Sequence, residues 1–163
     1  MATTTATITL SSADLLSDNL SLSSTTTLYD ARTTTGLTQY EMGRVLIPSS
    51  NANVILIDAT AAGAGDASKV YIANKNTDVT QFVVISINSV ELGRLYSGDW
   101  MFIPWSQSTT TVVVNDVESV VRHDIEIFCP TTASGTHPNG AGNPTADIEY
   151  MVFNQGKTFV GAA

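Results

Sequence analysis

Short apolar runs rich in Val and Ile recur along the chain from residue 45 onward, and segments rich in Gly, Ser, Asn and Asp separate them. β-branched residues favour extended backbone, and the intervening residue types favour turns. No long segment shows the 3.6-residue period of an amphipathic helix. The pattern predicts β-strands within residues 45–47, 54–57, 70–72, 82–87, 90–95, 100–103, 110–114, 120–129 and 148–153.

The alternation of apolar and charged positions is most regular over residues 120–129. Successive side chains of a strand point to opposite faces of its sheet, so every second residue shares a face. We therefore expect one half-buried strand here, with the charged residues facing water. Its inner face would carry Val121, His123, Ile125, Ile127 and Cys129, and its outer face Arg122, Asp124 and Glu126.

Residues 68–105 contain four predicted strands joined by three polar segments. Two of these segments, Asn88-Ser89 and Ser97-Gly98-Asp99, consist of residue types that tolerate a positive φ or close a turn through their own side chain. Consecutive strands joined by tight turns are usually neighbours in one sheet. The stretch therefore predicts a four-stranded meander, and Pro104 would end its last strand because Pro donates no hydrogen bond.

Many short strands separated by turn signals are typical of all-β folds. The predicted fold class is an antiparallel β-sandwich of jelly-roll-like type, or a barrel, with an extended N-terminal segment. The chain of 163 residues is long enough to build one substantial core without disulfides. We expect an extended N-terminal arm or edge-strand region over residues 1–40 and the β-sandwich domain over residues 41–163.

The N-terminal segment differs in composition from the rest of the chain. It is rich in Thr and Ser, and its first aromatic residue is Tyr29. Few of its side chains are large enough to anchor a core, yet they alternate as in a half-buried strand. One interpretation is an arm that reaches a partner, and the other is an ordinary first hairpin of the domain. The predicted partner contacts of this segment are Ile8, Leu10, Leu20 and Leu22.

Charge is scarce and its sign is negative. Charged residues make up 13% of the chain, and seven Lys and Arg against fifteen Asp and Glu give a net charge of −8. Nucleic-acid binding and attraction to anionic membranes both need clustered positive charge, so neither is expected. Short uncharged polar side chains replace the missing charges, and such a surface loses little ionic solvation when a neighbour covers it. This composition suits a protein packed against other subunits.

Targeting signals and membrane spans are not expected from the sequence. The N-terminal residues include no basic cluster followed by an apolar stretch, and no apolar run approaches the ~18 residues of a membrane helix. Cys129 is the single cysteine, so it has no partner for a disulfide within the chain. We expect it to be a small buried side chain rather than a reactive nucleophile.

Groups that could support catalysis are few. His123 lies among apolar neighbours, without a nucleophile or an orienting carboxylate at a suitable spacing, and His137 lies in a Gly- and Pro-rich segment. Two distant histidines without Cys or carboxylate partners at ligand spacing do not form a zinc site. The sequence therefore predicts no enzyme, no metal site and no cofactor.

Aromatic residues gather at the end of the 68–105 stretch. Trp100, Phe102 and Trp105 crowd the far end of this stretch. One interpretation is core packing with one residue at the rim. The other is an anchor at a subunit interface, where large amphipathic aromatics are favoured. These three residues complete the set of candidate interface positions.

The same stretch carries a family resemblance. The order of VYIAN, a polar turn, a hairpin, LGRL and GDWMFIPW resembles small virion proteins of tailed bacteriophages, particularly those of marine and cyanobacterial hosts, over about a quarter of the chain. The resemblance implies a β-sandwich structural protein of the virion, of the capsid decoration (cement) type, which is often trimeric. It implies no catalytic or ligand-binding residues.

From this resemblance we expect a protein made in the host cytoplasm and located on the capsid surface, with further copies of itself and the major capsid protein as partners. A tail tube or adaptor component is the first alternative, because such components also use small β domains. A lectin-like carbohydrate-binding module is the second, because Tyr96, Asp99 and Trp100 lie close together in sequence, as sugar-binding aromatics and carboxylates do.

Overall fold

The computed structural model describes residues 3–13, 20–30, 34, 36–37, 39–49, 52–59, 68–77, 81–106, 109–114, 117–130 and 145–155. Within these ranges the regular structure is entirely β, as the sequence predicts. The strands are β1 (Thr4–Ser12), β2 (Leu20–Leu28), β3 (Gln39–Pro48), β4 (Val54–Ile57), β5 (Ser68–Asn74), β6 (Phe82–Ile87), β7 (Val90–Tyr96), β8 (Trp100–Trp105), β9 (Thr109–Val114), β10 (Val117–Arg122), β11 (Ile125–Phe128) and β12 (Thr145–Asn154).

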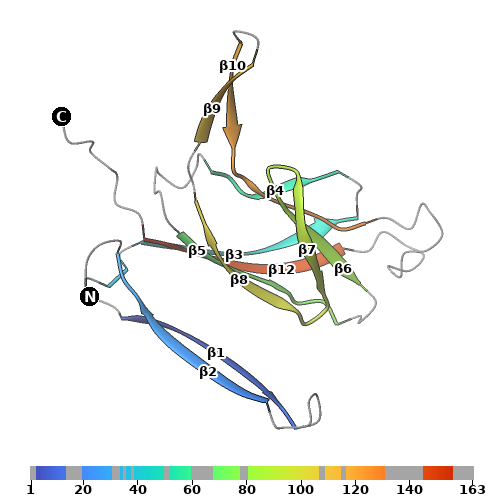
Figure 1. Ribbon diagram of the computed structural model, residues 1–163. Helices are drawn as coiled ribbons and strands as arrows, with labels where there is room; N and C mark the ends of the chain where they lie inside the picture. The colour runs from blue at the N-terminus through green and yellow to red at the C-terminus, as the bar shows by residue number, and fades with distance from the viewer. Residues whose placement is uncertain are drawn as a thin grey trace.

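Eight of these strands form two four-stranded antiparallel sheets (Figure 1). Sheet I has the order β3-β12-β5-β8, and sheet II has the order β4-β11-β6-β7. The chain passes from one sheet to the other at every connection between these strands except the β6–β7 hairpin. This is the strand order of a jelly roll. The predicted jelly-roll-like sandwich is therefore confirmed, and the barrel alternative is wrong.

The predicted meander over residues 68–105 is also wrong. β5 and β8 are neighbours in sheet I, whereas β6 and β7 lie in sheet II. The predicted turns are real: Asn88 and Ser89 have φ values of 49° and 60°, and Gly98 has a φ of 86°. Turn chemistry specifies where the chain reverses but not into which sheet it goes. Crossing between the sheets at both outer turns lets β5 and β8 cover the core from one side and β6 from the other.

The core lies between the inner faces of the two sheets. Val70 and Ile72 of sheet I face Ile85 and Ile127 of sheet II within one buried cluster. Burying an aliphatic side chain of this size contributes roughly 1.5–3 kcal/mol to folding. Trp105 belongs to the same cluster, and its indole Nε1 donates a hydrogen bond of 2.7 Å to the carbonyl oxygen of His123. The sandwich thus closes around its own apolar side chains.

The single strand predicted over residues 120–129 is divided in two. β10 ends at Arg122 and β11 begins at Ile125, so the alternation does not continue through His123 and Asp124. Asp124 was expected to face water but is buried, and its carboxylate accepts a hydrogen bond of 2.8 Å from the Ala59 amide. This bond holds the chain where it re-enters the sandwich. Ile125, Ile127 and Cys129 are buried, as predicted.

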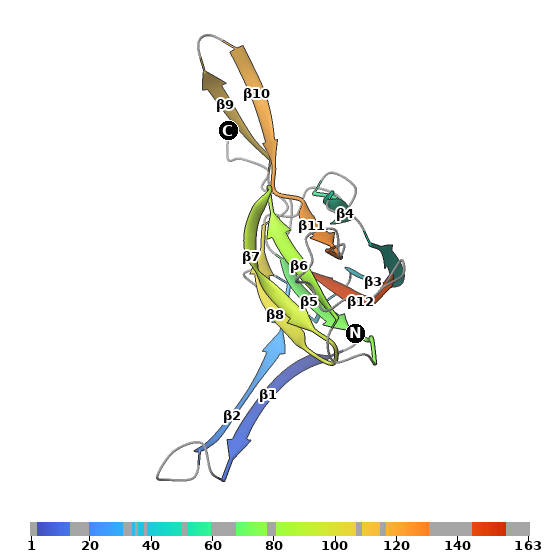
Figure 2. The same ribbon diagram turned by 90° about the vertical axis from the view of Figure 1, so that its right-hand side faces the viewer.

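The two remaining strand pairs form hairpins that project from opposite ends of the sandwich (Figures 1 and 2). β1 pairs with β2, and β9 pairs with β10, and none of these four strands pairs with a strand of either sheet. The N-terminal hairpin is therefore not part of the domain's own sheets. Its base is anchored by the buried side chains of Leu28 and Leu37 and by a hydrogen bond from Gln155 Nε2 to the Tyr29 carbonyl.

A buried asparagine ties sheet I to the β7–β8 turn. Asn74 at the end of β5 is fully buried, and its Nδ2 donates to the Leu95 carbonyl at 3.0 Å. Its Oδ1 accepts from the Asn76 amide at 3.1 Å, and its backbone carbonyl accepts from the Gly98 amide at 2.9 Å. Two segments that are distant in sequence, residues 74–76 and 95–98, therefore meet at this asparagine.

Replacing Asn74 by Ala tests this junction. The substitution leaves the Leu95 carbonyl and the Asn76 amide without their side-chain partner, so we expect the free energy of unfolding in urea to fall by about 1–3 kcal/mol. Thr77→Ala, at an exposed position nearby, is the control and should change it by less than ~0.5 kcal/mol. Equal effects of the two substitutions would contradict this role for Asn74.

A second prediction concerns acid stability. The Arg44 guanidinium binds both carboxylate oxygens of Asp147, and this hydrogen bonding lowers the pKa of Asp147 from its ordinary value of 3.8. A carboxyl whose folded-state pKa is depressed stabilises the fold above its unfolded-state pKa, and that contribution disappears as the pH falls through the folded-state pKa. Asp147→Asn should therefore be less stable than the parent at neutral pH, with the difference vanishing below pH 3.8. Unfolding curves that differ equally at every pH would contradict this assignment.

Candidate functional site

The outer face of sheet I carries an apolar row that crosses all four strands. The strand register places Met42 of β3, Met151 of β12, Tyr71 of β5 and Phe102 of β8 side by side on this face. The inward-facing neighbours of Tyr71 and Met151 include the core residues Val70, Ile72 and Val152, so β5 and β12 carry apolar residues on both faces here. An antiparallel sheet with one face toward water usually carries polar residues on that face. Sheet I departs from this pattern.

Further aromatic side chains extend the row diagonally. The rings of Tyr71 and Trp100 lie 6.2 Å apart, and those of Phe102 and Phe153 lie 6.3 Å apart. Such tilted or edge-on pairs stabilise each other without covering the cluster from water. Trp100 is 49% exposed and Met42 is 61% exposed. The cluster is therefore an apolar surface rather than a second core.

Sheet II carries both polar and apolar side chains on its outer face. There the Glu126 carboxylate accepts hydrogen bonds from Asn53 Nδ2 at 2.8 Å and from Ser86 Oγ at 3.3 Å. The Arg94 guanidinium lies 5.1 Å from the centre of the Phe82 ring. Ile55 and Tyr96 on the same face are 50% and 43% exposed, so these polar contacts cover the outer face of sheet II only in part.

The β1–β2 hairpin has one hydroxyl face and one apolar face. On the hydroxyl face, Thr7 Oγ1 lies 3.0 Å from Thr25 Oγ1. The remaining cross-strand pairs on this face also consist of Thr or Ser: Thr5–Thr27, Thr9–Ser23 and Ser11–Ser21. The apolar face carries Ile8, Leu10, Leu22 and Leu28. The register assigns Leu20 to this face as well, but its side chain lies outside the described structure.

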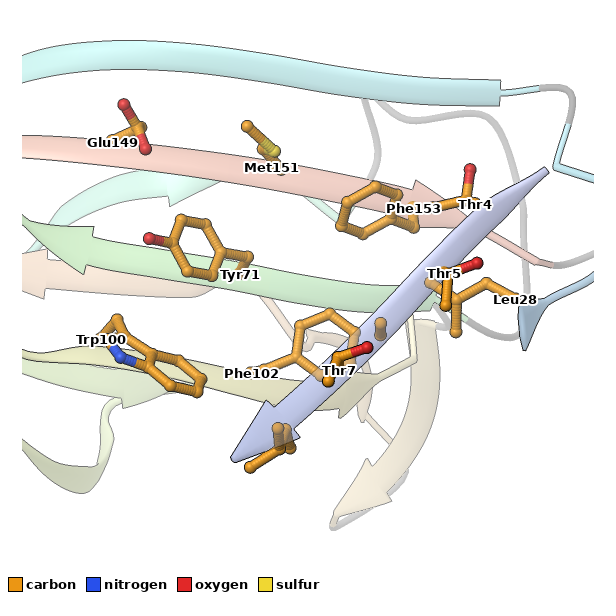
Figure 3. Close-up of a pocket in the computed structure, with 12 residues that line it drawn as sticks. Thr4, Thr5, Thr7, Leu28, Tyr71, Trp100, Phe102, Glu149, Met151 and Phe153 are labelled. Atoms are coloured by element: carbon orange, nitrogen blue, oxygen red, sulfur yellow. The ribbon is translucent and has the colours of Figure 1, made fainter. Parts of the chain in front are cut away.

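An open groove lies between this hairpin and the outer face of sheet I (Figure 3), and we call it the arm groove. Its volume is about 380 Å³. Ala6, Ile8 and Leu28 line it from the hairpin, and Trp100 and Phe102 line it from sheet I. Glu149 is its single lining residue with a carboxylate among the described residues. The groove is therefore apolar and bordered by hydroxyl groups, with one acidic side chain.

Beyond the groove, the β1–β2 hairpin projects away from the sandwich (Figure 2). Ile8, Leu10 and Leu22, which lie toward its tip, are exposed. An isolated two-stranded ribbon is marginally stable in water, and an exposed apolar stripe further disfavours it. The hairpin thus continues the apolar surface of sheet I away from the domain.

The candidate interface residues divide into two groups. Ile8, Leu10 and Leu22 lie on the hairpin, and Trp100 and Phe102 lie in the arm groove. The structure thus brings the N-terminal candidates and two of the aromatic candidates to one surface. Trp105 does not join them, because it faces the opposite side of β8 and is 5% exposed in the core.

Sequence analysis missed four residues of this surface on sheet I, namely Met42, Tyr71, Met151 and Phe153. Three of them lie next to core residues of their own strands, as Met151 does between Tyr150 and the buried Val152. A strand that is apolar at every position indicates burial of both faces. A shorter signal of this kind, four consecutive apolar residues, is present at residues 70–73 of β5 and 150–153 of β12, but it does not show what covers the second face.

The β9–β10 hairpin, at the other end of the sandwich, is a second projecting apolar element. The register places Val113 and Val120 on one face, and they are 59% and 62% exposed. Arg122 lies on the same face, two residues after Val120, at the base of the hairpin. Sequence analysis predicted β9, and it predicted the end of β10 only as part of one strand over residues 120–129; it did not predict that the pair lies outside the sandwich.

Groups with catalytic or metal-binding chemistry are sparse in the described ranges. No cluster of three or more His, Cys, Asp or Glu that could hold a metal occurs there. Burial raises the pKa of the Cys129 thiol, which keeps it protonated. His123 lies between β10 and β11 and accepts the Trp105 hydrogen bond through its backbone, and His137 lies outside the described residues.

In the described part of the chain, no helix is long and apolar enough to cross a bilayer. No protein-family model matches the sequence, and a search of curated proteins also gives no match. The geometry of the surface is thus the main guide to function.

The two tryptophans provide a direct test of this geometry, because Trp100 is half exposed and Trp105 is in the core. We expect iodide to quench part of the fluorescence of the native protein. Trp100→Phe should remove most of the quenchable component and move the emission maximum to shorter wavelength. In urea both tryptophans should be quenched alike, which is the control. Strong quenching in Trp100→Phe under native conditions would contradict the placement of Trp105.

Proposed function

We propose that this protein is a structural protein of a phage virion, a capsid decoration (cement) protein that binds the outer surface of the capsid and stabilises the head through contacts between subunits. The observation that carries the proposal is an apolar surface outside a closed core, extended by a hairpin that projects from the domain. Its proposed partners are the major capsid protein and further copies of the chain, in a homotrimer.

The arm groove and the hairpin have the properties of a contact surface. Contiguous apolar surface outside a core marks an interaction site in most folded proteins. Tyr, Trp, Phe and Met are the residues enriched at the centres of protein interfaces, and Tyr71, Trp100, Phe102 and Met151 are of these types. A partner that covers them removes apolar area from water with little ionic desolvation, because Glu149 is the single carboxylate in the described lining.

The fold is compatible with this role but is not by itself evidence for it. Jelly rolls occur in viral capsid proteins and also in lectins and cupins, so topology alone does not assign a function. The resemblance of residues 68–105 to phage virion proteins favours the first of these classes. The scarcity of catalytic groups along the described groove favours a structural role over an enzymatic one.

A tail tube or adaptor component is the second candidate. The two hairpins project from opposite ends of the sandwich (Figure 1), and this arrangement suits subunits that follow one another around a ring. A decoration protein would form trimers or bind capsids as single subunits. A tail protein would form six-fold rings, which mass photometry of the purified protein distinguishes from trimers.

The carbohydrate-binding alternative receives less support from the geometry. It would use Trp100 as a stacking platform and Asp99 as a hydrogen-bonding neighbour. The Asp99 carboxylate instead accepts a hydrogen bond of 2.9 Å from the Tyr96 amide and closes the β7–β8 turn. Binding to a glycan array, abolished by Trp100→Ala, would revive this alternative.

Deleting residues 1–27 tests the decoration proposal. The truncation keeps Leu28, Leu37 and the Tyr29 anchor, so we expect a folded sandwich with a cooperative urea transition. It removes most of the apolar hairpin face, so we expect it to stop co-sedimenting with empty shells of the major capsid protein encoded in the same genome. Full binding by the truncated protein would contradict the role of the hairpin.

A matched pair of substitutions provides the control for that experiment. Ile8→Asp places a charge on the apolar face, and Thr9→Asp places the same charge on the hydroxyl face of the same strand, away from the groove lining. We expect the first to weaken shell binding at least tenfold and the second to weaken it much less, because a desolvated charge at an interface is costly. Equal losses would show that general charge repulsion, rather than the apolar face, is responsible.

A further inference from the structure

The two strands of the β9–β10 hairpin pair with each other and with no other described strand. They project beyond the sandwich in both views (Figures 1 and 2), and they pack mainly against each other. The direction of the hairpin therefore depends on the two connections at its base. One of them leads from β8 to β9, and the other leads from β10 to β11.

The connection from β10 to β11 is fixed to the sandwich at Asp124. The buried Asp124 carboxylate accepts a hydrogen bond of 2.8 Å from the Ala59 amide, and the Asp124 backbone carbonyl accepts one of 3.2 Å from the Asn88 amide. Ala59 follows β4 and Asn88 follows β6, so both donors belong to the side of sheet II. Asp124 therefore moves with the sandwich, whereas β10 ends two residues before it, at Arg122.

The connection from β8 to β9 begins at Trp105, on the other sheet. The Trp105 side chain lies in the core, and its backbone pairs with Ser68 of β5 in sheet I. The Trp105 Nε1 donates a hydrogen bond of 2.7 Å to the carbonyl oxygen of His123, which is the residue between Arg122 and Asp124. One indole thus joins the two connections at the point where the hairpin leaves the sandwich.

The base of the hairpin is not closely packed. An open pocket of about 230 Å³ lies there, and its described lining is Ile87, Pro104, Trp105, Ser106 and His123. Protein interiors are normally close-packed, and close packing is what makes an element rigid. The connections at this base therefore have room to bend, and hydrogen bonds take over part of the work of packing.

We propose that His123 is the hinge of the β9–β10 hairpin, and that the hydrogen bond from Trp105 to His123 fixes the direction in which the hairpin projects. While the bond is made, the His123 carbonyl cannot turn away from the indole, so the backbone torsions beside it are restrained. When the bond breaks, the hairpin can swing about the short link between Arg122 and Asp124. A few residues at the end of an element commonly absorb such a change.

A hinged hairpin can meet a partner at more than one angle, and closing the bond again then holds the angle of the free chain. The inference goes beyond the decoration role, because it concerns the isolated chain in the absence of any particle. Its test is therefore independent of capsid binding.

Distances between two spin labels on the full chain measure the hinge directly. Cys129 is buried, so the labels attach to introduced cysteines. Val120→Cys places one label on the hairpin, and Met42→Cys places the other on sheet I, both at exposed positions. We expect a narrow distance distribution when Trp105 is intact. Trp105→Phe keeps an aromatic ring in the core but removes the N–H donor, and it should make the distribution about twice as wide, because the hinge residue then takes up several conformations.

A second pair of labels shows whether the sandwich itself loosens. Met42→Cys and Leu92→Cys lie on sheet I and sheet II, at exposed positions, and their distance distribution should stay narrow in Trp105→Phe. Widening of both label pairs would show that Trp105 stabilises the whole domain rather than the hairpin, and this would contradict the proposal. Asn74→Ala removes buried hydrogen bonds elsewhere and should leave the distribution between positions 42 and 120 unchanged.

A second variant separates the hydrogen bond from the volume of the indole. Replacing Trp105 by benzothienylalanine keeps the bicyclic ring and puts sulfur in place of the N–H, so it removes the donor alone. It decides the result if Trp105→Phe is unfolded by circular dichroism. A distribution between positions 42 and 120 that is as narrow with this analogue as with Trp105 would overturn the proposal. A distribution that is already as wide with Trp105 intact would overturn it too, because the bond would then fix nothing.

Discussion

A sandwich can bury only one face of each sheet, and the organisation of this molecule follows from that constraint. The inner faces of sheets I and II supply a continuous core that includes Val70, Ile85, Ile127 and Ile148. This core is what makes the domain stable, since apolar burial is the dominant favourable contribution to folding. Whatever is apolar on an outer face, or on a strand outside the sheets, stays in contact with water in the single chain.

The two outer faces differ in how far their apolar side chains are covered. On sheet II, the polar side chains of Glu126 and Arg94 cover part of the outer face, while Ile55 and Tyr96 stay exposed. Sheet I instead presents aromatic and Met side chains beside a hairpin with an apolar face. A second hairpin with exposed Val side chains lies at the far end. These unsatisfied surfaces are uncharged or nearly so, which is why we interpret them as contacts between subunits rather than as sites of chemistry.

Sequence patterns predicted the strands and the jelly-roll-like sandwich, because alternation and turn residues act locally. They did not predict the sheet to which each strand belongs, because the turn at Gly98 looks the same whether the chain stays in a sheet or crosses the core. They also did not separate Trp100 from Trp105, since alternation shows that two residues share or oppose a face but not which face is covered. The prediction that Asp124 faces water was wrong. Its buried carboxylate accepts a hydrogen bond from the Ala59 amide, 65 residues away, and local alternation does not reveal such a contact.

The central claim is that the sandwich is stable alone, whereas the two hairpins gain their stability from partners. Hydrogen–deuterium exchange on the monomeric and the assembled protein measures this directly. The account predicts strong protection of the β5 and β12 amides in both states, and weak protection of β1, β2, β9 and β10 in the monomer that rises several-fold or more on assembly. Hairpin amides that are as protected in the monomer as those of β12 would contradict it.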